Sequence, residues 1–122
     1  MRIREELPTE HPGVLDEING LLDRLPDPEH LSAEQRAGSM AHAAGLRNRL
    51  DAWLTALAGA ADVHGDSRVL HAGTTGMLVA AATSSNPAAG SAAVARAKAL
   101  RGLPAVAQAF AAGQLSSAHV AV

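Results

Sequence analysis

The sequence contains no cysteine and no tyrosine, and it has one tryptophan and one phenylalanine. The absence of cysteine excludes disulfides, thiolate metal sites and cysteine nucleophiles. The charged start, MRIREELPTEH, lacks the apolar core of a signal peptide, and no apolar run reaches the roughly eighteen residues that a membrane span requires. These absences predict a cytoplasmic protein that does not enter a membrane.

Alanine supplies much of the 48% hydrophobic content of the 122 residues. Alanine favours helices and lets them approach closely, but it buries little apolar area per residue. The composition therefore predicts an all-α fold, a small multi-helix bundle with a modest core. We expect a flexible arm over residues 1–11 and a single helical domain over residues 12–122.

The apolar spacing predicts a first helix from Pro12 to Leu25 and a turn at LPDPEHL, where each proline disfavours the α region for the preceding residue. Ser32 and Gln35 then match a capping box, which predicts the start of a long helix over residues 32–63. A loop is predicted at residues 60–73, where two glycines interrupt the periodicity.

The predicted long helix would span about 45 Å, more than the diameter of so small a domain. Part of it must therefore pack against something else, and a second copy or a partner helix is the simplest expectation. The residues predicted to form this oligomer interface are Met40, Leu50, Trp53, Leu54 and Leu57.

After Gly73 the sequence predicts short helices separated by tight turns. Asn86 fits an N-cap with Pro87 at the first helical position, Gly113 fits a helix stop, and Ser116 or Ser117 fits a further cap. Two short helices joined by a tight turn, over residues 74–101, predict a pair resembling a helix-turn-helix.

The charges are distributed unevenly along the chain. Residues 1–66 contain all twelve acidic residues and carry a net charge of −6, whereas residues 67–122 carry +4. Such asymmetry indicates either a polyanion such as double-stranded DNA as partner, or attraction between the two halves. The candidate nucleic-acid contacts are Arg68, Asn86, Ser91, Arg96, Lys98 and Arg101.

The predicted second helix of the pair does not present its cations as one stripe. At about 100° per residue, Ser91 and Lys98 share an edge, Arg101 lies about 60° from Lys98, and Arg96 lies about 160° from it. A DNA contact would therefore be weak, and helix packing remains the alternative.

No catalytic motif is present, and the sequence predicts no cofactor and no small-molecule substrate. A metal site is conceivable only in the predicted loop, where imidazoles and carboxylates gather, although solvated loop residues explain the same pattern. His42 and His119 are expected to pack within helices, since no catalytic partner is placed by spacing. The loop set is Asp62, His64, Asp66 and His71.

Residues 95–120, ARAKALRGLPAVAQAFAAGQLSSAHV, combine an A-x-A-L-x-x-L-P element with G-x-L-S-x-x-H. With Thr83 and Pro87, they resemble the domain of unknown function numbered 222, found in high-GC bacteria, often ahead of an HNH endonuclease domain. The stretch is also distantly similar to the helix-turn-helix region of ParB-type partition proteins. The resemblance implies a non-catalytic helical domain of an HNH-endonuclease-type protein, associated with DNA and truncated at Val122. Any nuclease domain would lie downstream.

Two functional interpretations therefore stand side by side. The chain either contributes DNA association, or it is a protein-interaction and oligomerisation module that pairs through the helix at residues 32–63 without binding nucleic acid.

Overall fold

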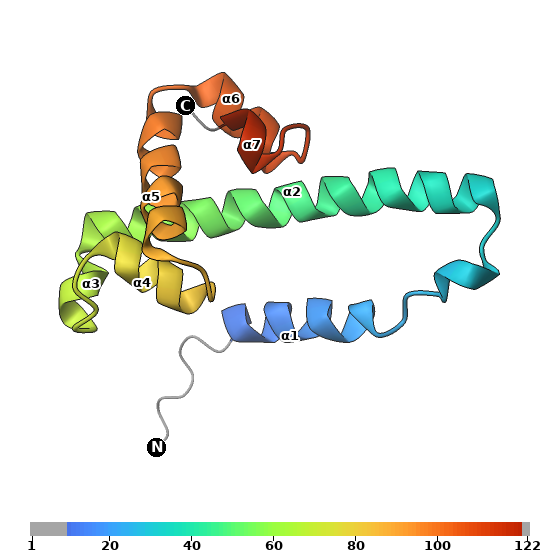
Figure 1. Ribbon diagram of the computed structural model, residues 1–122, viewed down its shortest axis with the longest axis horizontal. Helices are drawn as coiled ribbons and strands as arrows, with labels where there is room; N and C mark the ends of the chain where they lie inside the picture. The colour runs from blue at the N-terminus through green and yellow to red at the C-terminus, as the bar shows by residue number, and fades with distance from the viewer. Residues whose placement is uncertain (1–9, 121–122) are drawn as a thin grey trace, which may run out of the picture. The chain divides into compact units, whose positions relative to one another are not determined.

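The computed structural model describes residues 10–120, with side chains from residue 13 onward, and this range is all-helical. Seven α-helices and one 3₁₀ helix occur in it, and no strand does, which confirms the predicted fold class. The elements are α1 (Glu10–Leu22), η2 (Pro28–His30), α2 (Ala33–His64), α3 (Asp66–Val69), α4 (Thr75–Ala82), α5 (Pro87–Arg101), α6 (Pro104–Ala111) and α7 (Ser117–Val120) (Figure 1).

Contacts group the residues into two compact units, one ending at Gly38 and the other beginning at Ser39. The boundary falls inside α2, which continues through it as one helix. Nine residues of the predicted N-terminal arm lie outside the described range, as do residues 121 and 122, and α1 already begins at Glu10.

The first unit contains α1, η2 and the first turns of α2. Asp27 caps η2 by accepting a hydrogen bond from the Glu29 amide at 3.0 Å. The predicted capping box is confirmed: the Ser32 amide donates to Gln35 Oε1 at 2.9 Å, and the Gln35 amide donates to Ser32 Oγ at 3.1 Å. The large apolar side chains of α1 are exposed, namely Val14, Leu15, Ile18, Leu21 and Leu22.

The long helix predicted at residues 32–63 is confirmed as α2, which has 32 residues and contains no proline. The predicted loop at residues 60–73 is partly wrong, because it includes the end of α2 and the short helix α3. In α2 the buried residues are Thr55, Ala58 and Gly59. The helix therefore uses small residues on the face that packs within the second unit.

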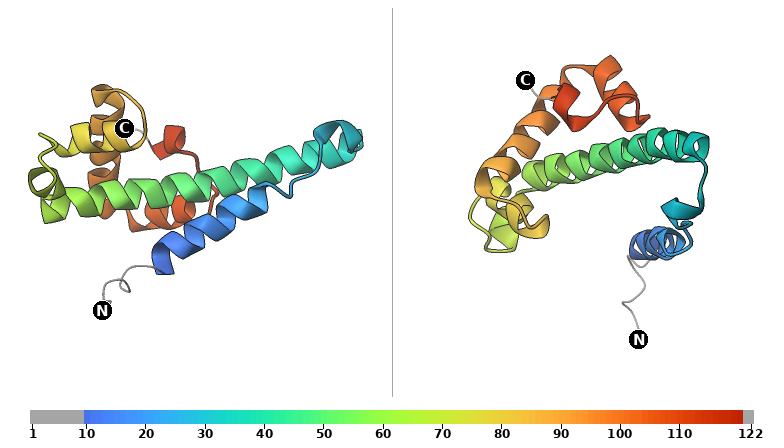
Figure 2. Two further views of the ribbon diagram at one scale, coloured as in Figure 1. Left: turned by 90° about the horizontal axis from the view of Figure 1, so that it is seen from below. Right: turned by 45° about the vertical axis from the view of Figure 1, so that its right-hand side comes forward.

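In the second unit, α3 and α4 follow at the C-terminal end of α2, α5 runs across α2, and α6 and α7 lie beside the middle of α2 (Figures 1 and 2). The core is small and centred on Phe110, whose side chain is 1% exposed. The other buried apolar residues are smaller: Ala58, Ala80, Val94, Ala97 and Val120. Little apolar area is buried per residue, as the alanine-rich composition predicts.

Helices α4 and α5 form the predicted pair, and they cross at two buried glycines. A Cβ on Gly90 would collide with the carbonyl oxygen of Gly76 and would lie 3.0 Å from the amide nitrogen of Ala80. Because neither glycine has a side chain, the two backbones touch at this point. The crossing sets the position of α5, which carries most of the candidate nucleic-acid residues.

Gly113 ends the turn after α6, as predicted for a helix stop, and it also contacts α2. Its φ is +84°, a left-handed conformation that glycine adopts without strain. A Cβ here would lie 2.7 Å from the carbonyl oxygen of Gly45, and Asn48 donates from its side-chain Nδ2 to the Gly113 carbonyl at 3.4 Å. The turn is thereby held against the middle of α2.

Candidate functional site

Asn86 acts on its own helix. Its Oδ1 accepts a hydrogen bond from the Ala89 amide at 2.8 Å, and Pro87 occupies the first turn of α5, so the predicted N-cap is confirmed. An N-cap side chain satisfies one of the amide groups that a helix start leaves without a partner. The acceptor atom of Asn86 is therefore already used within α5.

Ser91 lies at the crossing of α4 and α5. A Cβ on Gly76 would lie 2.6 Å from Ser91 Oγ and 3.1 Å from the Ser91 amide nitrogen. Ser91 is exposed on one side and touches α4 on the other. A larger side chain than serine at this position would press against α4.

Lys98 and Arg101 both reach across to α2. Lys98 Nζ lies 3.8 Å from Asp62 Oδ2, and Arg101 donates from Nη2 to the carbonyl oxygen of Gly59 at 3.2 Å. The two cations are three residues apart on α5, and their partners are three residues apart on α2. The structure therefore brings these two predicted contacts together and gives both an intramolecular partner.

The strength of the two contacts differs. The side chain of Lys98 is 59% exposed, and an ion pair so open to water is worth between zero and about 1 kcal/mol. Asp62 also accepts a hydrogen bond from Thr75 Oγ1 at 2.8 Å, which fixes the carboxylate. The Arg101 contact is part-buried and lies where Gly59 and Ala97 let α2 and α5 approach closely.

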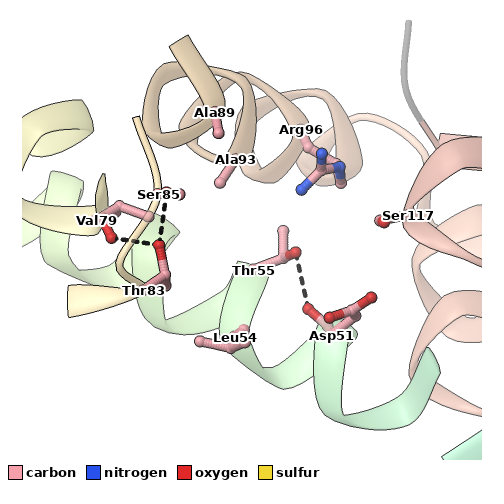
Figure 3. A pocket seen from close by; sticks show the side chains of 10 residues that line it. All are labelled: Asp51, Leu54, Thr55, Val79, Thr83, Ser85, Ala89, Ala93, Arg96 and Ser117. Carbon is pink, nitrogen blue, oxygen red and sulfur yellow. Dashed lines mark hydrogen bonds between the residues drawn. The ribbon is translucent and has the colours of Figure 1, made fainter. Parts of the chain in front are cut away.

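Arg96 points away from these two cations, as the helical angles predict. Its side chain enters a pocket of about 150 Å³ in the second unit (Figure 3). The Nε atom is buried and has no hydrogen-bond partner among the residues that the structure describes. A guanidinium placed in this way is not available as part of a surface with Lys98.

The pocket around Arg96 is small and of mixed character. Arg96 and Asp51 are the two charged residues in its lining, and the hydroxyl of Thr55 donates to the Asp51 carbonyl at 2.9 Å (Figure 3). One guanidinium and one carboxylate balance each other, so the pocket favours neither anions nor cations by net charge. The rest of its lining is Leu54, Val79, Thr83, Ser85, Ala89, Ala93 and Ser117.

Arg68 is exposed on the short helix α3. Its guanidinium folds back toward the preceding turn, where a Cβ on Gly65 would lie 2.9 Å from Arg68 Nη2. The six predicted nucleic-acid residues thus occupy different places: a cap, a helix crossing, a contact line with α2, a pocket and a separate helix. The structure unites only Lys98 and Arg101.

The histidine and carboxylate residues near the end of α2 do not assemble. Among the residues that the structure describes, no group of three or more potential ligands could hold a metal ion. Asp62 is committed to Thr75 and Lys98, and His71 adopts a left-handed backbone conformation with φ of 54°.

His119 has a local structural role. The Ser116 amide donates to His119 Nδ1 at 3.2 Å, and Ser116 Oγ accepts from the His119 amide at 3.4 Å. This reciprocal pair resembles a capping box with histidine in place of glutamate. It confirms Ser116 as a cap of α7 and explains why an imidazole stands three residues after it.

The second candidate surface is the face of α2 that points away from α5 and α6. At about 100° per residue, four large apolar residues lie between about 140° and 180° from the buried Thr55. We call them the outward stripe. They are Leu46, Leu50, Trp53 and Leu57, with side chains between 36% and 53% exposed.

The outward stripe differs in two ways from the predicted interface. Leu46, 53% exposed, is missing from the prediction, although its spacing of four residues from Leu50 is the signal that places it there. Met40 is 68% exposed but lies about 120° from Leu46 around the helix. Leu54 lies at the edge of the stripe, where it also lines the Arg96 pocket.

Comparison with known proteins gives one result. The model of a family described as a domain of unknown function (DUF222) matches residues 37–122, and the chain belongs to this family. The match confirms the resemblance drawn from the motifs at residues 95–120. Neither the comparison with curated proteins nor that with solved structures found a match. Within the described residues, no helix has the length and apolar character needed to cross a membrane.

Proposed function

We propose that this DUF222 chain is a helical association module that forms oligomers through the outward stripe of α2. The observation that carries the proposal is the arrangement of large and small side chains on this helix. Its inner face packs through Thr55, Ala58 and Gly59, whereas the leucines and the tryptophan remain on the other face. Contiguous apolar surface on a helix is typical of a face that binds another helix.

The spacing within the outward stripe supports the same function. Residues 46, 50, 53 and 57 follow each other at intervals of four, three and four, which is the pattern of a coiled-coil seam. No charged residue falls within the stripe, so no ion has to be desolvated when it is covered. Knobs-into-holes packing of such a seam is the most economical way to bury it.

Light scattering on the full chain tests the proposal. We expect the unaltered protein to be a dimer and the Leu50→Glu variant to be a monomer, because a carboxylate at the centre of the stripe would have to be buried. Circular dichroism should show the same helix content in both, since position 50 is not part of the core.

Met40→Glu provides the matched control, because it introduces the same charge at an exposed apolar position off the stripe. That variant should remain dimeric. A monomeric parent protein, or a Leu50→Glu variant that dimerises as well as the parent, contradicts the proposal.

DNA association is a second candidate, and one observation favours it: the segment after Asp66 contains no acidic residue, and Arg68 and Lys98 on it are exposed. Positive charge along a duplex gives affinity that falls steeply with salt. Replacing both residues by glutamate should then abolish a gel shift with duplex DNA at low salt. Arg24→Glu with Arg47→Glu changes the net charge equally and should leave the shift in place. A shift that persists in the first variant contradicts this candidate.

A further inference from the structure

We infer that the pocket around Arg96 binds a small zwitterion of the α-amino acid type, with the ligand's carboxylate on Arg96 and its ammonium group on Asp51. The pocket lies apart from the exposed apolar residues of α2, and the inference does not depend on the proposed function. It rests on two opposite charges that share one pocket and are not paired with each other.

The pocket is a wedge between two helices that cross. Helices α2 and α5 touch at Gly59, where an added Cβ would lie 3.0 Å from the Ala97 Cβ. Crossing helices diverge away from their point of contact, and Asp51 precedes Gly59 by eight residues, which is about 12 Å along α2. Residues of α4 and Ser117 of α7 close the sides of the wedge, which leaves a space of about 150 Å³ (Figure 3).

Arg96 supplies the half of the pocket that binds an anion. Its side chain comes from α5, and its guanidinium points into the pocket (Figure 3). Nε is buried without a hydrogen-bond partner, whereas the two terminal nitrogens stay open to the pocket and donate to no residue that the structure describes. A guanidinium removed from water in this way lacks acceptors, and a carboxylate accepts from two of its N–H groups at once.

Asp51 supplies the half that binds a cation. It projects from α2 on the opposite side of the pocket (Figure 3). Over residues 13–120, its carboxylate forms no hydrogen bond and no ion pair, although its backbone carbonyl accepts from Thr55 Oγ1 at 2.9 Å. An ammonium group offers three N–H donors to such a carboxylate. Ser117 lies beside the gap, and its hydroxyl can donate to one end of a ligand or accept from the other.

An ion of one sign satisfies only half of this pocket. An anion on Arg96 would face the Asp51 carboxylate, and a cation on Asp51 would face the guanidinium, so each binds against a repulsion that partial burial strengthens. Water can bridge the two groups but compensates neither charge. A molecule with both charges a few bonds apart satisfies both. The volume holds roughly five water molecules at about 30 Å³ each, which suits glycine or alanine and excludes amino acids with large side chains.

An NMR titration of the nitrogen-15-labelled full chain tests the inference, with the Nε–H signal of Arg96 as reporter. The ligands are free glycine, acetate and methylammonium at constant ionic strength, because the last two each carry one of the two charges of glycine. We expect glycine to shift the signal to saturation with a dissociation constant on the order of 1 mM, ordinary for so few atoms. Acetate and methylammonium should bind at least tenfold more weakly.

Two variants remove the two charges separately. Asp51→Asn and Arg96→Gln should each weaken glycine binding at least tenfold, and in Arg96→Gln the amide signal of Ser117 replaces the lost reporter. Arg47→Gln is the matched control, because Arg47 is an exposed arginine outside the pocket lining, and it should bind glycine like the parent. If Arg96→Gln fails to fold, Asp51→Asn and the three ligands still decide the question.

Saturation is the decisive readout, because glycine also stabilises proteins in general as an excluded osmolyte, without a binding site. A saturable shift that is lost in the two pocket variants supports the inference. Acetate binding as tightly as glycine, or Asp51→Asn binding glycine like the parent, overturns it, because the site then takes an anion only. A shift that never saturates also overturns it and leaves the pocket to water or to a direct pair of Arg96 with Asp51. None of these results bears on the oligomeric state of Leu50→Glu.

Discussion

The two faces of α2 reverse the usual relation between side-chain size and burial. The face that packs inside the second unit carries Thr55, Ala58 and Gly59, whereas the opposite face carries three leucines and a tryptophan. Large apolar residues are normally placed inside, because they bury the most area. Here the inner face consists of small residues that allow close approach, and the large apolar residues of the opposite face stay between 36% and 53% exposed.

The crossing of α4 and α5 also depends on small residues, and the helices come even closer together there. Gly76 and Gly90 bring two backbones into contact, and Ala80 packs beside them. Such a contact gains little from hydrophobic area but much from dense packing. The second unit is thus organised by steric fit between small residues, with Phe110 as its one large anchor.

Among the substitutions considered, Gly90→Val is expected to lower the unfolding free energy the most. The new side chain has no space, because its Cβ collides with the carbonyl group of Gly76 and lies 3.0 Å from the amide nitrogen of Ala80, both of them backbone groups of α4. We expect a loss of about 3 kcal/mol or more of unfolding free energy, at the upper end of overpacking effects. Chemical denaturation followed by circular dichroism measures it.

Gly38→Ala is the control for the glycine substitution. A Cβ on Gly38 meets nothing within 4 Å, and the residue lies in the interior of a helix. Alanine should therefore increase stability by up to about 1 kcal/mol through helix propensity alone. If both substitutions change stability equally, close packing at the crossing is not what holds α4 to α5.

An intermediate effect is expected from truncating one large residue in each region. Phe110→Ala removes the most buried side chain and should cost about 3 to 5 kcal/mol. Leu50→Ala, at protein concentrations low enough to dissociate oligomers, should cost less than about 1 kcal/mol, because the side chain is 46% exposed. Thermal melts at two protein concentrations separate the stability of the single chain from the contribution of association.

The two variants, Phe110→Ala and Leu50→Ala, should differ in how their effect depends on protein concentration. At high protein concentration the cost of Leu50→Ala should rise, because mass action adds the lost association to the unfolding free energy. The cost of Phe110→Ala should be the same at both concentrations. A large, concentration-independent cost at position 50 would show that the outward stripe is already buried within one chain.

The smallest effect is expected from Lys98→Met. The ion pair with Asp62 is 3.8 Å long and the lysine is 59% exposed, so its loss should change stability by less than about 0.5 kcal/mol. The difference should vanish at high salt, where the pair is screened. Denaturation midpoints at two salt concentrations check it, and a loss that survives screening would indicate that packing of the lysine stem matters more than its charge.

Much of the secondary structure follows from local chemistry. The capping box at Ser32 and Gln35, the Asn86 cap, the Pro87 start and the left-handed Gly113 are each decided within a few residues of the chain. These signals predict where helices begin and end because they act on backbone groups that the helix itself leaves without partners. The short helix α3 has no side-chain cap, and the sequence therefore predicts a loop there.

The candidate site was less predictable, because the direction of a side chain depends on which elements pack together. The angles around α5 separate Arg96 from Lys98, but they do not reveal that Arg96 enters a pocket or that Lys98 and Arg101 reach α2. The uneven charge distribution allows either a polyanion partner or attraction between the two halves, and only the fold shows that Lys98 lies beside Asp62. Partners distant in sequence become visible only in the fold.

For this protein, the sequence alone determined that the chain is helical, where its long helix lies, and which family it resembles. Periodicity, caps and composition suffice for these, since they reflect forces within a few turns of one helix. Only the tertiary structure decided which face of α2 is inside. An amphipathic pattern favours the leucine side, but the close approach of Gly59 to Ala97 and the backbone contact between Gly76 and Gly90 require small residues at these positions. Steric fit between segments that are distant in sequence cannot be read from either segment alone.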